Sequence, residues 1–357
     1  MAPTKAVILA HPQDAPGPVG SAPRFVRDSL PPAPLLSVAN RPLLAHALSW
    51  LDQGGVHQAA VIVPCELAEP ARRAAAGACA GMEISWLEQV PDETLGWSLG
   101  RLGDFLDGHS FVLHQADSVA KQSLSSLVED APECDVDALL MEDDSQPTEL
   151  GQVFELRAGG NGSGPVRNSH AAGVAVLCAE AIEAASSLDV RRELCAETLA
   201  EAIGHRGGCV RTRGVSDWWR FRGGGADGLL EGNRFALEGQ QADFAAAHVR
   251  DSKIQGPVVA HPSAYIESSV VRGPVVIGER VELRNAYVGP YTSIGDDVTV
   301  EGAEIEHSVI FAGASISHLG GRLEASVVGP KSKVFRDFRL PRALRLTVGE
   351  GAEVSLT

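Results

Sequence analysis

The stretch VVIGERVELRNAYVGPYTSIGDDVTV, residues 275–300, decides the fold of the C-terminal part of the chain. An aliphatic residue followed by a small one returns about every six positions, which places three short strands in each coil of a solenoid. The aliphatic side chain then points inward and the small residue lies at the corner. The pattern predicts a parallel β-helix, and its aliphatic positions are Ile277, Leu283, Val288, Ile294, Val300, Ile305, Ile310, Ile316 and Val328.

The β-helix has two possible roles. It can cap a neighbouring domain and mediate self-association, because its faces are short and flat and the ends of the coil are open. It can also hold an acyltransferase site between coils, which usually uses a histidine. His261, His307 and His318 lie in this region but in no extended loop. The sequence favours the first role and predicts a homo-oligomer formed through the β-helix.

Residues 1–240 have a different sequence pattern, in which short apolar runs alternate with segments of helical periodicity. This alternation is typical of an α/β domain with a largely parallel sheet. Strands are expected at Ala6–Ala10, Ala59–Val63, Ile84–Leu87, Ser110–His114, Ala138–Met141, Gln152–Leu156 and Gly173–Cys178. Helices are expected near residues 42–53, 66–78, 95–107, 119–130 and 190–204. A linker over 241–254 would then join this domain to a β-helix over 255–357.

Length and composition agree with two globular domains. The chain has 357 residues, of which 44% are hydrophobic and 21% are charged. It is therefore too long for one ordinary core and too apolar for disorder. No apolar run reaches the ~18 residues of a membrane span, and the first apolar run is too short for a secretory signal. Six cysteines without a CxxC pair indicate reduced thiols, so a cytoplasmic location without a membrane partner is expected.

The charged residues restrict the partners further. The formal net charge is −16, so most of the surface repels polyanions and nucleic acid is not an expected partner. A small anion such as a nucleotide or a sugar phosphate needs only a local cationic pocket and stays compatible. Of the 30 basic residues five are lysines: Lys5, Lys121, Lys253, Lys331 and Lys333. No function can therefore depend on a lysine between residues 122 and 252.

Several segments resemble one enzyme family, in order along nearly the whole chain. YVGPYTSIGDDVTVEGAEIEH, Tyr287–His307, is similar to the β-helix of long-form glucose-1-phosphate thymidylyltransferases of antibiotic deoxysugar pathways. LLEGNR at Leu229–Arg234, VANRP at Val38–Pro42 and the pair Trp218–Trp219 resemble further family segments. The resemblance implies a Rossmann-like nucleotidyltransferase domain with a mixed, mostly parallel sheet, followed by a left-handed parallel β-helix. It also implies a place in bacterial secondary metabolism.

The family joins a sugar 1-phosphate to a nucleoside triphosphate and releases pyrophosphate, using backbone amides, cations and Mg²⁺ to hold the phosphates. This chain departs from the motifs that supply these groups. Prolines at 12, 16 and 18 interrupt the loop that is glycine-rich in the family and remove amide donors, although Arg24 or Arg27 could reach a phosphate from it. Ala33 occupies the position of the lysine that precedes the family's VANKP segment. The lysine of the family's EKP motif has no counterpart in this chain.

The family's pair of metal-binding aspartates keeps one member. Asp117, in HQADS, matches the first aspartate, whereas Phe221, in WWRFRG, stands at the second and Arg222 replaces a neighbouring threonine. Mg²⁺ is usually held by one or two carboxylates together with substrate oxygens and water. An aromatic ring and two arginines weaken such a site. Mg²⁺ is therefore expected as a cofactor only if the nucleotidyltransferase activity is retained.

The resemblance assigns candidate roles to eight residues. Asp117, Arg24 and Arg222 are the catalytic candidates, with Asp117 also as the metal ligand. On the substrate side, Gln89 would read the nucleotide base and Gly96, in a segment similar to the family's PLG, would let the base approach the backbone. The remaining candidates for contacts with substrate are Glu193, Trp219 and Arg220.

Three functions stay open at this point. The favoured one is a homologue with an eroded active site that no longer makes sugar nucleotides. Such a pseudoenzyme would bind an anionic ligand or a partner protein, or would run a different reaction. The second is an active nucleotidyltransferase in which arginines substitute for the missing lysines, although arginine replaces the charge and not the geometry. The third is an oligomeric β-helix scaffold. Losing one preorganised donor typically costs ~10²–10³ in rate, and several groups are lost together here.

Overall fold

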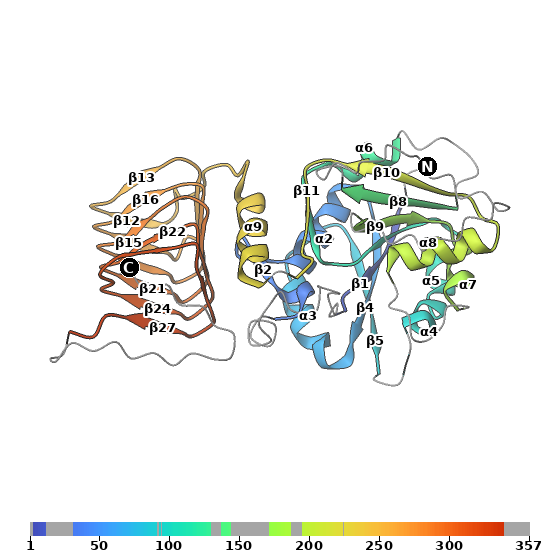
Figure 1. Cartoon of the computed structure of the whole chain (residues 1–357), viewed down its shortest axis with the longest axis horizontal. Coiled ribbons are helices and arrows are strands. Elements are labelled where there is room, and N and C mark those ends of the chain that lie inside the picture. The colour runs from blue at the N-terminus through green and yellow to red at the C-terminus, as the bar shows by residue number, and fades with distance from the viewer. Residues whose placement is uncertain are drawn as a thin grey trace. The chain divides into compact units, whose positions relative to one another are not determined.

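The computed structural model describes residues 3–11, 31–90, 93, 95–129, 137–143, 171–186, 195–223 and 225–338. By its internal contacts the chain divides into two compact units, which Figure 1 shows. Residues 32–35 and 42–220, together with the N-terminal strand, form the first unit. Residues 36–41 and the chain from Phe221 onward form the second. No described helix has both the length and the apolar character needed to cross a membrane.

A seven-stranded sheet forms the centre of the first unit, in the order β10-β8-β9-β6-β1-β4-β5. Its strands are β1 (Lys5–Leu9), β4 (Gln58–Pro64), β5 (Glu83–Gln89), β6 (Phe111–His114), β8 (Ala138–Asp143), β9 (Ala171–Leu177) and β10 (Val210–Val215). β9 runs antiparallel to β6 and β8, and the other neighbouring pairs are parallel. The expected mixed, mostly parallel sheet of a Rossmann-like domain is confirmed.

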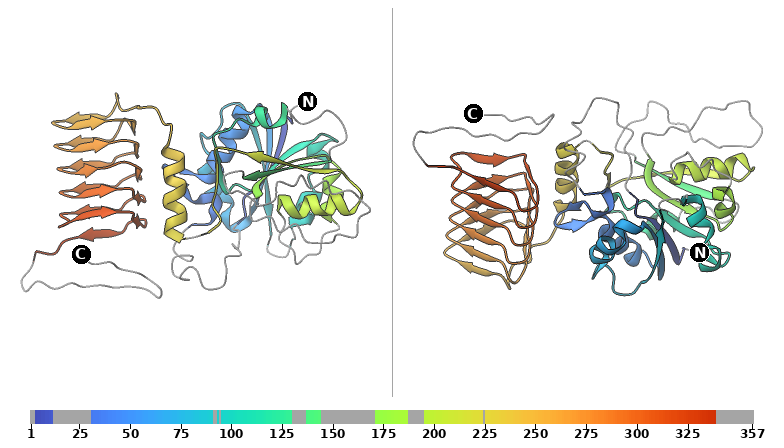
Figure 2. Two further views of the ribbon diagram at one scale, coloured as in Figure 1. Left: turned by 45° about the horizontal axis from the view of Figure 1, so that its top comes forward. Right: turned by 90° about the horizontal axis from the view of Figure 1, so that it is seen from below.

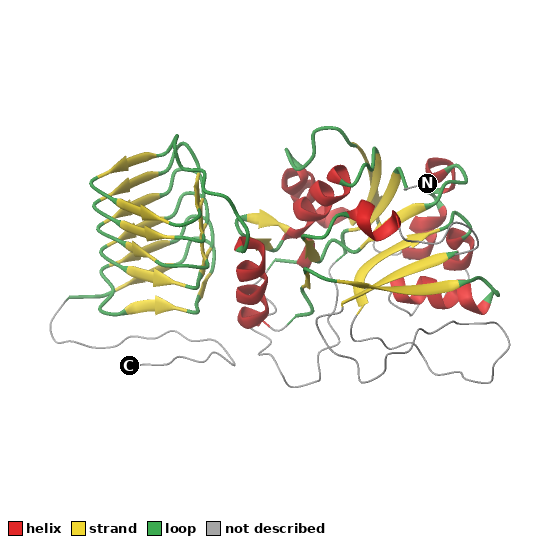
Figure 3. Ribbon diagram, turned by 90° about the horizontal axis from the view of Figure 1, so that it is seen from above, coloured by secondary structure: helices red, strands yellow, loops and turns green. Residues whose placement is uncertain are grey.

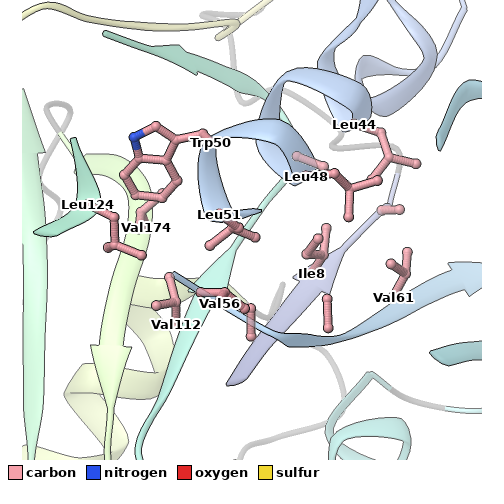
Figure 4. Close-up of a cluster of buried hydrophobic side chains, with 14 of the residues drawn as sticks. Ile8, Leu44, Leu48, Trp50, Leu51, Val56, Val61, Val112, Leu124 and Val174 are labelled. Atoms are coloured by element: carbon pink, nitrogen blue, oxygen red, sulfur yellow. The ribbon is translucent and has the colours of Figure 1, made fainter. Parts of the chain in front are cut away.

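Helices cover both faces of this sheet. One face packs against η1 (Ala33–Leu35), α2 (Leu43–Gln53), η2 (Cys65–Leu67), α3 (Ala68–Ala75) and α6 (Leu124–Glu129). The other face packs against α4 (Leu95–Gly100), α5 (Gly103–Leu106), α7 (Ala181–Ser186) and α8 (Ala196–His205). A strand buried on both sides reads as a continuous apolar run, which explains the run in β1: Ala6 and Ile8 join one cluster, Val7 and Leu9 the other. Figure 4 shows the first of these clusters around Ile8 and Trp50.

The helix expected near 119–130 is shorter than the sequence suggested. Ser118–Ala120 forms strand β7, which pairs antiparallel with β11 (Trp218–Arg220), so the helix begins only at Leu124. This pairing is a long-range contact that a local helical pattern cannot reveal. The strand expected at Gln152–Leu156 lies outside the described residues.

The second unit contains the expected left-handed parallel β-helix, whose strands stack in three parallel sheets (Figure 2). The first sheet contains β12 (His248–Arg250), β15 (Tyr265–Glu267), β18 (Glu282–Arg284), β21 (Thr299–Glu301), β24 (Ser315–Ser317) and β27 (Lys333–Phe335). The second contains β13 (Lys253–Gln255), β16 (Val270–Arg272), β19 (Tyr287–Val288), β22 (Glu304–Glu306) and β25 (Arg322–Glu324). The third contains β14 (Val258–Ala260), β17 (Val275–Ile277), β20 (Thr292–Ile294), β23 (Val309–Ile310) and β26 (Val327–Val328).

Aliphatic ladders fill the inside of the β-helix. Ile266, Leu283, Val300 and Ile316 pair in register and are all fully buried. Each coil thus stacks an aliphatic side chain over that of the neighbouring coil, as the repeat in the sequence predicted. The strands begin at His248, inside the segment 241–254 that the sequence marked as a linker. That segment lacks the aliphatic–small pairs of the later coils, so its first strands were not visible in the pattern.

Helix α9 (Gly225–Leu237) and a tight hairpin pack on the β-helix within the second unit (Figure 3). The hairpin joins β2 (Ser37–Val38) to β3 (Arg41–Pro42) through Ala39 and Asn40, which have φ values of 48° and 59°. Two consecutive positive φ values are typical of a type I′ turn. The side-chain amide of Asn40 donates to the carbonyl of Ile294, so the turn is tied to the coil.

Asn233 of α9 connects all three elements of the second unit. Its side chain is fully buried. The amide oxygen accepts from the backbone N–H of Ala39 at 2.9 Å and from the hydroxyl of Ser293. The amide nitrogen donates to the carbonyl of Tyr291 at 3.0 Å. One side chain therefore satisfies polar groups of the hairpin and of the β-helix that would otherwise be buried without partners.

We expect Asn233→Ala to lower the free energy of unfolding of the second unit by about 2–4 kcal/mol, because it leaves several buried groups without hydrogen bonds. Urea denaturation followed by circular dichroism measures this loss. The matched control is Glu231→Ala, an exposed position of the same helix, for which a change within about 0.5 kcal/mol is expected. Equal effects of the two substitutions would contradict this role of Asn233.

Candidate functional site

The candidate site lies at the carboxyl edge of the parallel strands in the first unit. β6 ends at His114, and the chain turns through Gln115 and Ala116, whose φ is 52°, before Asp117. β1 and β4, parallel neighbours in the same sheet, end at this edge as well. In open α/β sheets, ligands bind outside the carboxyl ends of the strands. The fold therefore places Asp117 at the edge of the sheet where such ligands bind, and its catalytic role stays a prediction.

Asp117 is held in a buried ion pair. Nε of Arg220 donates to Oδ2 of Asp117 at 2.8 Å, and Nη2 of Arg220 donates to Oε1 of Gln115 at 2.8 Å. The Asp117 side chain is 1% exposed and that of Arg220 is 9% exposed. Arg220 reaches this position because β11 pairs with β7, which places Arg220 opposite Ser118. The carboxylate and the guanidinium together carry no net charge.

Gly173 makes room for this ion pair. It lies in β9 with a φ of 77°, and its carbonyl accepts from the backbone N–H of Gln115 at 3.0 Å. A Cβ atom at this position would lie 2.9 Å from Nε of Arg220 and 2.9 Å from Oδ1 of Asp117. Both the backbone conformation and the close approach require glycine.

His114 is a structural residue beneath the site. Its Nδ1 accepts from the backbone N–H of Ala116 at 2.9 Å, so the ring proton lies on Nε2, 3.5 Å from the hydroxyl of Ser118. The ring packs among Trp50 and Trp218, with ring centroids 5.7 and 6.3 Å away. Burial, reinforced by the charge of Arg220, lowers the pKa of His114 to about 3. The imidazole is therefore neutral and unsuited to proton transfer near pH 7.

Gln89 lies at the same edge of the sheet, at the end of β5, which β1 and β4 separate from β6. It is 8% exposed, and its side-chain amide donates to the carbonyl of Glu93 at 2.6 Å. His11, at the end of β1, lies beside it. Burial lowers the pKa of His11, and the negative charge of Glu66 and hydrogen bonding with the Gln89 side chain oppose this effect. Gly96 follows in α4.

The structure brings some of the sequence-predicted residues together. Arg220 forms an ion pair with Asp117. Trp219 precedes Arg220 in β11 and is 7% exposed. Arg222 is exposed and belongs to the second unit. Arg24 and Glu193 lie outside the described residues. The catalytic and substrate-binding roles of all these residues stay predictions.

Sequence reasoning missed two residues of the site, Gln115 and Gly173. Gln115 stands next to Asp117 in the HQADS segment, but the resemblance gave it no role. A glycine inside the apolar strand AAGVAVL was the available signal for Gly173, because glycine inside a strand often marks a close approach of backbone or side chain. Its partners could not be named, since they lie far away in the sequence.

The residues of the site do not fit a divalent cation. Oδ2 of Asp117 already accepts a hydrogen bond from a guanidinium, and Phe221 stands where the resemblance places the second carboxylate. Throughout the described part of the chain, no three or more His, Cys, Asp or Glu side chains are grouped so that they could hold a metal ion. Mg²⁺ prefers carboxylate oxygens in a negatively charged surrounding, and the one carboxylate of this pair is already neutralised by Arg220.

The chain resembles known nucleotidyltransferases along most of its length. The chain is 31% identical over 339 residues to a low-salt glycan biosynthesis nucleotidyltransferase (Agl11) of Haloferax volcanii, with 91% of this chain and 94% of the relative covered. It is 28% identical over 350 residues to a glucose-1-phosphate thymidylyltransferase of Streptomyces griseus, with 90% and 93% covered. No protein-family profile matches the chain.

A solved structure with a similar fold is that of a putative glucose-1-phosphate thymidylyltransferase from Bacillus anthracis in complex with a sucrose. The likeness covers 67% of this chain and 97% of that one, with 17% sequence identity and a TM-score of 0.48. This similarity is too low to support an argument about the site.

We expect Gly173→Ala to lower the free energy of unfolding of the first unit by about 2–4 kcal/mol, because strain at positive φ adds to a clash with the ion pair. Gly207→Ala is the matched control: its φ is 89°, but a Cβ there meets nothing within 4 Å. Strain alone should cost about 1 kcal/mol. Urea denaturation of both variants gives the difference, and equal losses would exclude the clash.

The His114 imidazole should stay neutral down to about pH 4, because its pKa in the folded protein is about 3 against a reference of 6.5. Between these values the unfolded chain binds a proton that the folded chain does not, so this residue makes stability fall as pH decreases. The slope is about 1.4 kcal/mol for each pH unit. NMR titration of the ring measures it, with the urea-unfolded chain as the reference. A folded-state midpoint near 6.5 would contradict the account.

Proposed function

Because the chain belongs to the sugar-1-phosphate nucleotidyltransferase family, we propose that it binds a nucleotide or a sugar phosphate beside Asp117 but does not make sugar nucleotides by a Mg²⁺-dependent route. The names of its relatives supply the ligand class: one is a glycan biosynthesis nucleotidyltransferase and another a glucose-1-phosphate thymidylyltransferase. The same kinds of anion are the natural candidates for a site at the same edge of the sheet.

The observation that carries the proposal is the buried pair of Arg220 and Asp117. Nε of Arg220 donates to Oδ2 of Asp117 at 2.8 Å and so neutralises the carboxylate that would otherwise attract a metal ion. Removing the partner of a buried charge costs about 3–5 kcal/mol, so an entering cation has to displace Arg220 against this cost. Arg220 also repels a second cation at short range, because the low dielectric of a buried site strengthens the repulsion.

The chain also has fewer basic side chains to offset the charge of the phosphates. No lysine lies between residues 122 and 252, and Ala33 stands at the position of another family lysine. Transfer of a nucleotidyl group brings two polyanions together, and catalysis depends almost entirely on positioning and on compensating charge. The charge of Arg220 is balanced by Asp117. A neutral pair can lie beside a bound anion, but it supplies little of the charge compensation that the transfer reaction needs.

The experiment combines catalysis with binding. Purified protein is incubated with glucose 1-phosphate, Mg²⁺ and each of dTTP, UTP, GTP, CTP and ATP, and pyrophosphate release is measured. We expect no release above background, because the metal site is closed by Arg220. Calorimetry with the corresponding nucleoside diphosphates should detect binding whose affinity is the same in Mg²⁺ and in EDTA.

Two results would contradict the proposal. Pyrophosphate release that exceeds the background and disappears in EDTA would show an active metal-dependent nucleotidyltransferase. Absence of binding by any nucleotide or sugar phosphate would leave the β-helix scaffold as the better account. The comparison for the assay is the Asp117→Asn variant, used once thermal denaturation shows that it folds without its buried ion pair. Any pyrophosphate release by the unaltered protein that this variant loses would show that Asp117 takes part in the reaction.

A further inference from the structure

A serine, a histidine and a glutamate lie together on the surface of the β-helix. Ser263 and His261 belong to the corner that follows β14, and Glu279 belongs to the corner that follows β17 in the next coil. The two strands are parallel neighbours, with Val258 opposite Val275. The two corners are therefore stacked on one another, and all three side chains lie within the second unit.

The serine hydroxyl is hydrogen-bonded to the histidine ring. Oγ of Ser263 lies 2.8 Å from Nδ1 of His261. The backbone N–H of Ser263 donates to the same ring nitrogen at 3.2 Å, so Nδ1 carries a lone pair and no proton. The hydroxyl then donates to Nδ1, and the ring proton lies on Nε2. In this tautomer the imidazole is able to take the hydroxyl proton as a general base.

The other side of the ring faces a carboxylate. Nε2 of His261 lies 3.8 Å from Oε1 of Glu279, which is an ion-pair distance. Oε2 of Glu279 accepts from Nη1 of Arg280 at 2.7 Å, and the backbone N–H of Glu279 donates to Oδ1 of Asp296 at 2.7 Å. Both contacts hold Glu279 beside the ring. A carboxylate in this place stabilises the imidazolium that forms when the histidine accepts a proton.

The serine oxygen also accepts a hydrogen bond. The backbone N–H of Arg280 donates to Oγ of Ser263 at 2.8 Å. A hydrogen bond to an ionised oxygen is roughly twice as strong as one to a neutral oxygen, so this contact stabilises the oxygen as it loses its proton. Ser263 is exposed, and the side chains of His261 and Glu279 are 44% and 47% exposed. A substrate in solution therefore reaches the hydroxyl without a change in the fold.

We propose that this cluster is a second reactive site, in which Ser263 takes up an acyl group from an activated ester or thioester. Oγ of Ser263 attacks the acyl carbonyl carbon while its proton passes to Nδ1 of His261. The bond from this carbon to the leaving oxygen or sulfur then breaks, and the leaving group takes the proton from Nδ1. Water attacks the acyl group in the same way, which releases the carboxylic acid and restores the hydroxyl. Ser263 and His261 are the catalytic residues, and Glu279 is a positioning residue.

This activity goes beyond the proposed function and does not depend on it. The sequence favoured capping and self-association for the β-helix because His261 lies in no extended loop. No loop is needed here, because the stacking of the coils brings Glu279 beside the ring. The cluster lies in the second unit, whereas Asp117 lies in the first. It also requires neither a nucleotide nor a metal ion.

The test uses p-nitrophenyl acetate as the acyl donor to the full chain. We expect a rapid release of p-nitrophenolate, equimolar with the chain, followed by slower turnover. Peptide mass spectrometry should find the acetyl group on Ser263, and Ser263→Ala should abolish the rapid phase. His261→Gln should slow the acetylation about 10²-fold, the lower end of what a general base contributes. The matched controls are Ser268→Ala and His248→Gln, at exposed positions of the same β-helix, which should leave the rapid phase unchanged.

A double-mutant cycle tests the role of Glu279. Glu279→Gln should slow the acetylation roughly tenfold, because an amide does not stabilise the imidazolium. In the His261→Gln background the same substitution should have no further effect. A purely structural role of the carboxylate would give the same loss in both backgrounds. Thermal denaturation confirms that each variant is folded before its rate is scored.

Two results would overturn the inference. If Ser263 is acetylated no faster than Ser268, its hydroxyl is not activated and the hydrogen bonds only shape the corner of the coil. If His261→Gln leaves the rate of acetylation unchanged, the imidazole does not take the proton.

Discussion

The ion pair between Arg220 and Asp117 is the constraint on which the site depends. A guanidinium at 2.8 Å, with both side chains almost completely buried, supplies the positive charge that the carboxylate requires. The rest of the site is built around it: Gln115 accepts the second N–H of Arg220, Gly173 leaves the space, and His114 stays neutral beneath. Because Arg220 already neutralises the Asp117 carboxylate, no metal ion is needed to balance its charge. The loss of metal-dependent transfer that we propose follows from this pairing, while the fold and the aspartate are kept.

The second unit depends on a different kind of constraint. Its β-helix is held by ladders of identical aliphatic positions, and Asn233 ties the hairpin and α9 to the coils through buried hydrogen bonds. These contacts explain why the segments VANRP and LLEGNR accompany the β-helix in the sequence. They form a structural assembly inside the second unit, and their presence does not itself require catalysis.

The sequence predicted much of this fold because the signals were local and repeated. The ladder through Leu283, Val300 and Ile316 follows from side-chain periodicity alone, and buried strands such as β1 follow from apolar runs. The ion pair could not be predicted in the same way. Asp117 and Arg220 are brought together by the pairing of β7 with β11, and the sequence around Ser118 was read instead as helix. The resemblance identified both residues, but only the geometry joined them.

Crystals of the protein soaked in MnCl₂, with anomalous scattering recorded from the manganese, test the central claim most directly. The account predicts no anomalous peak within bonding distance of Asp117, and electron density for the Arg220 guanidinium still in contact with the carboxylate. A manganese ion bonded to Asp117, with Arg220 turned away, would contradict it. In that case the site would be an ordinary metal centre, and the arginine would be a movable counter-ion.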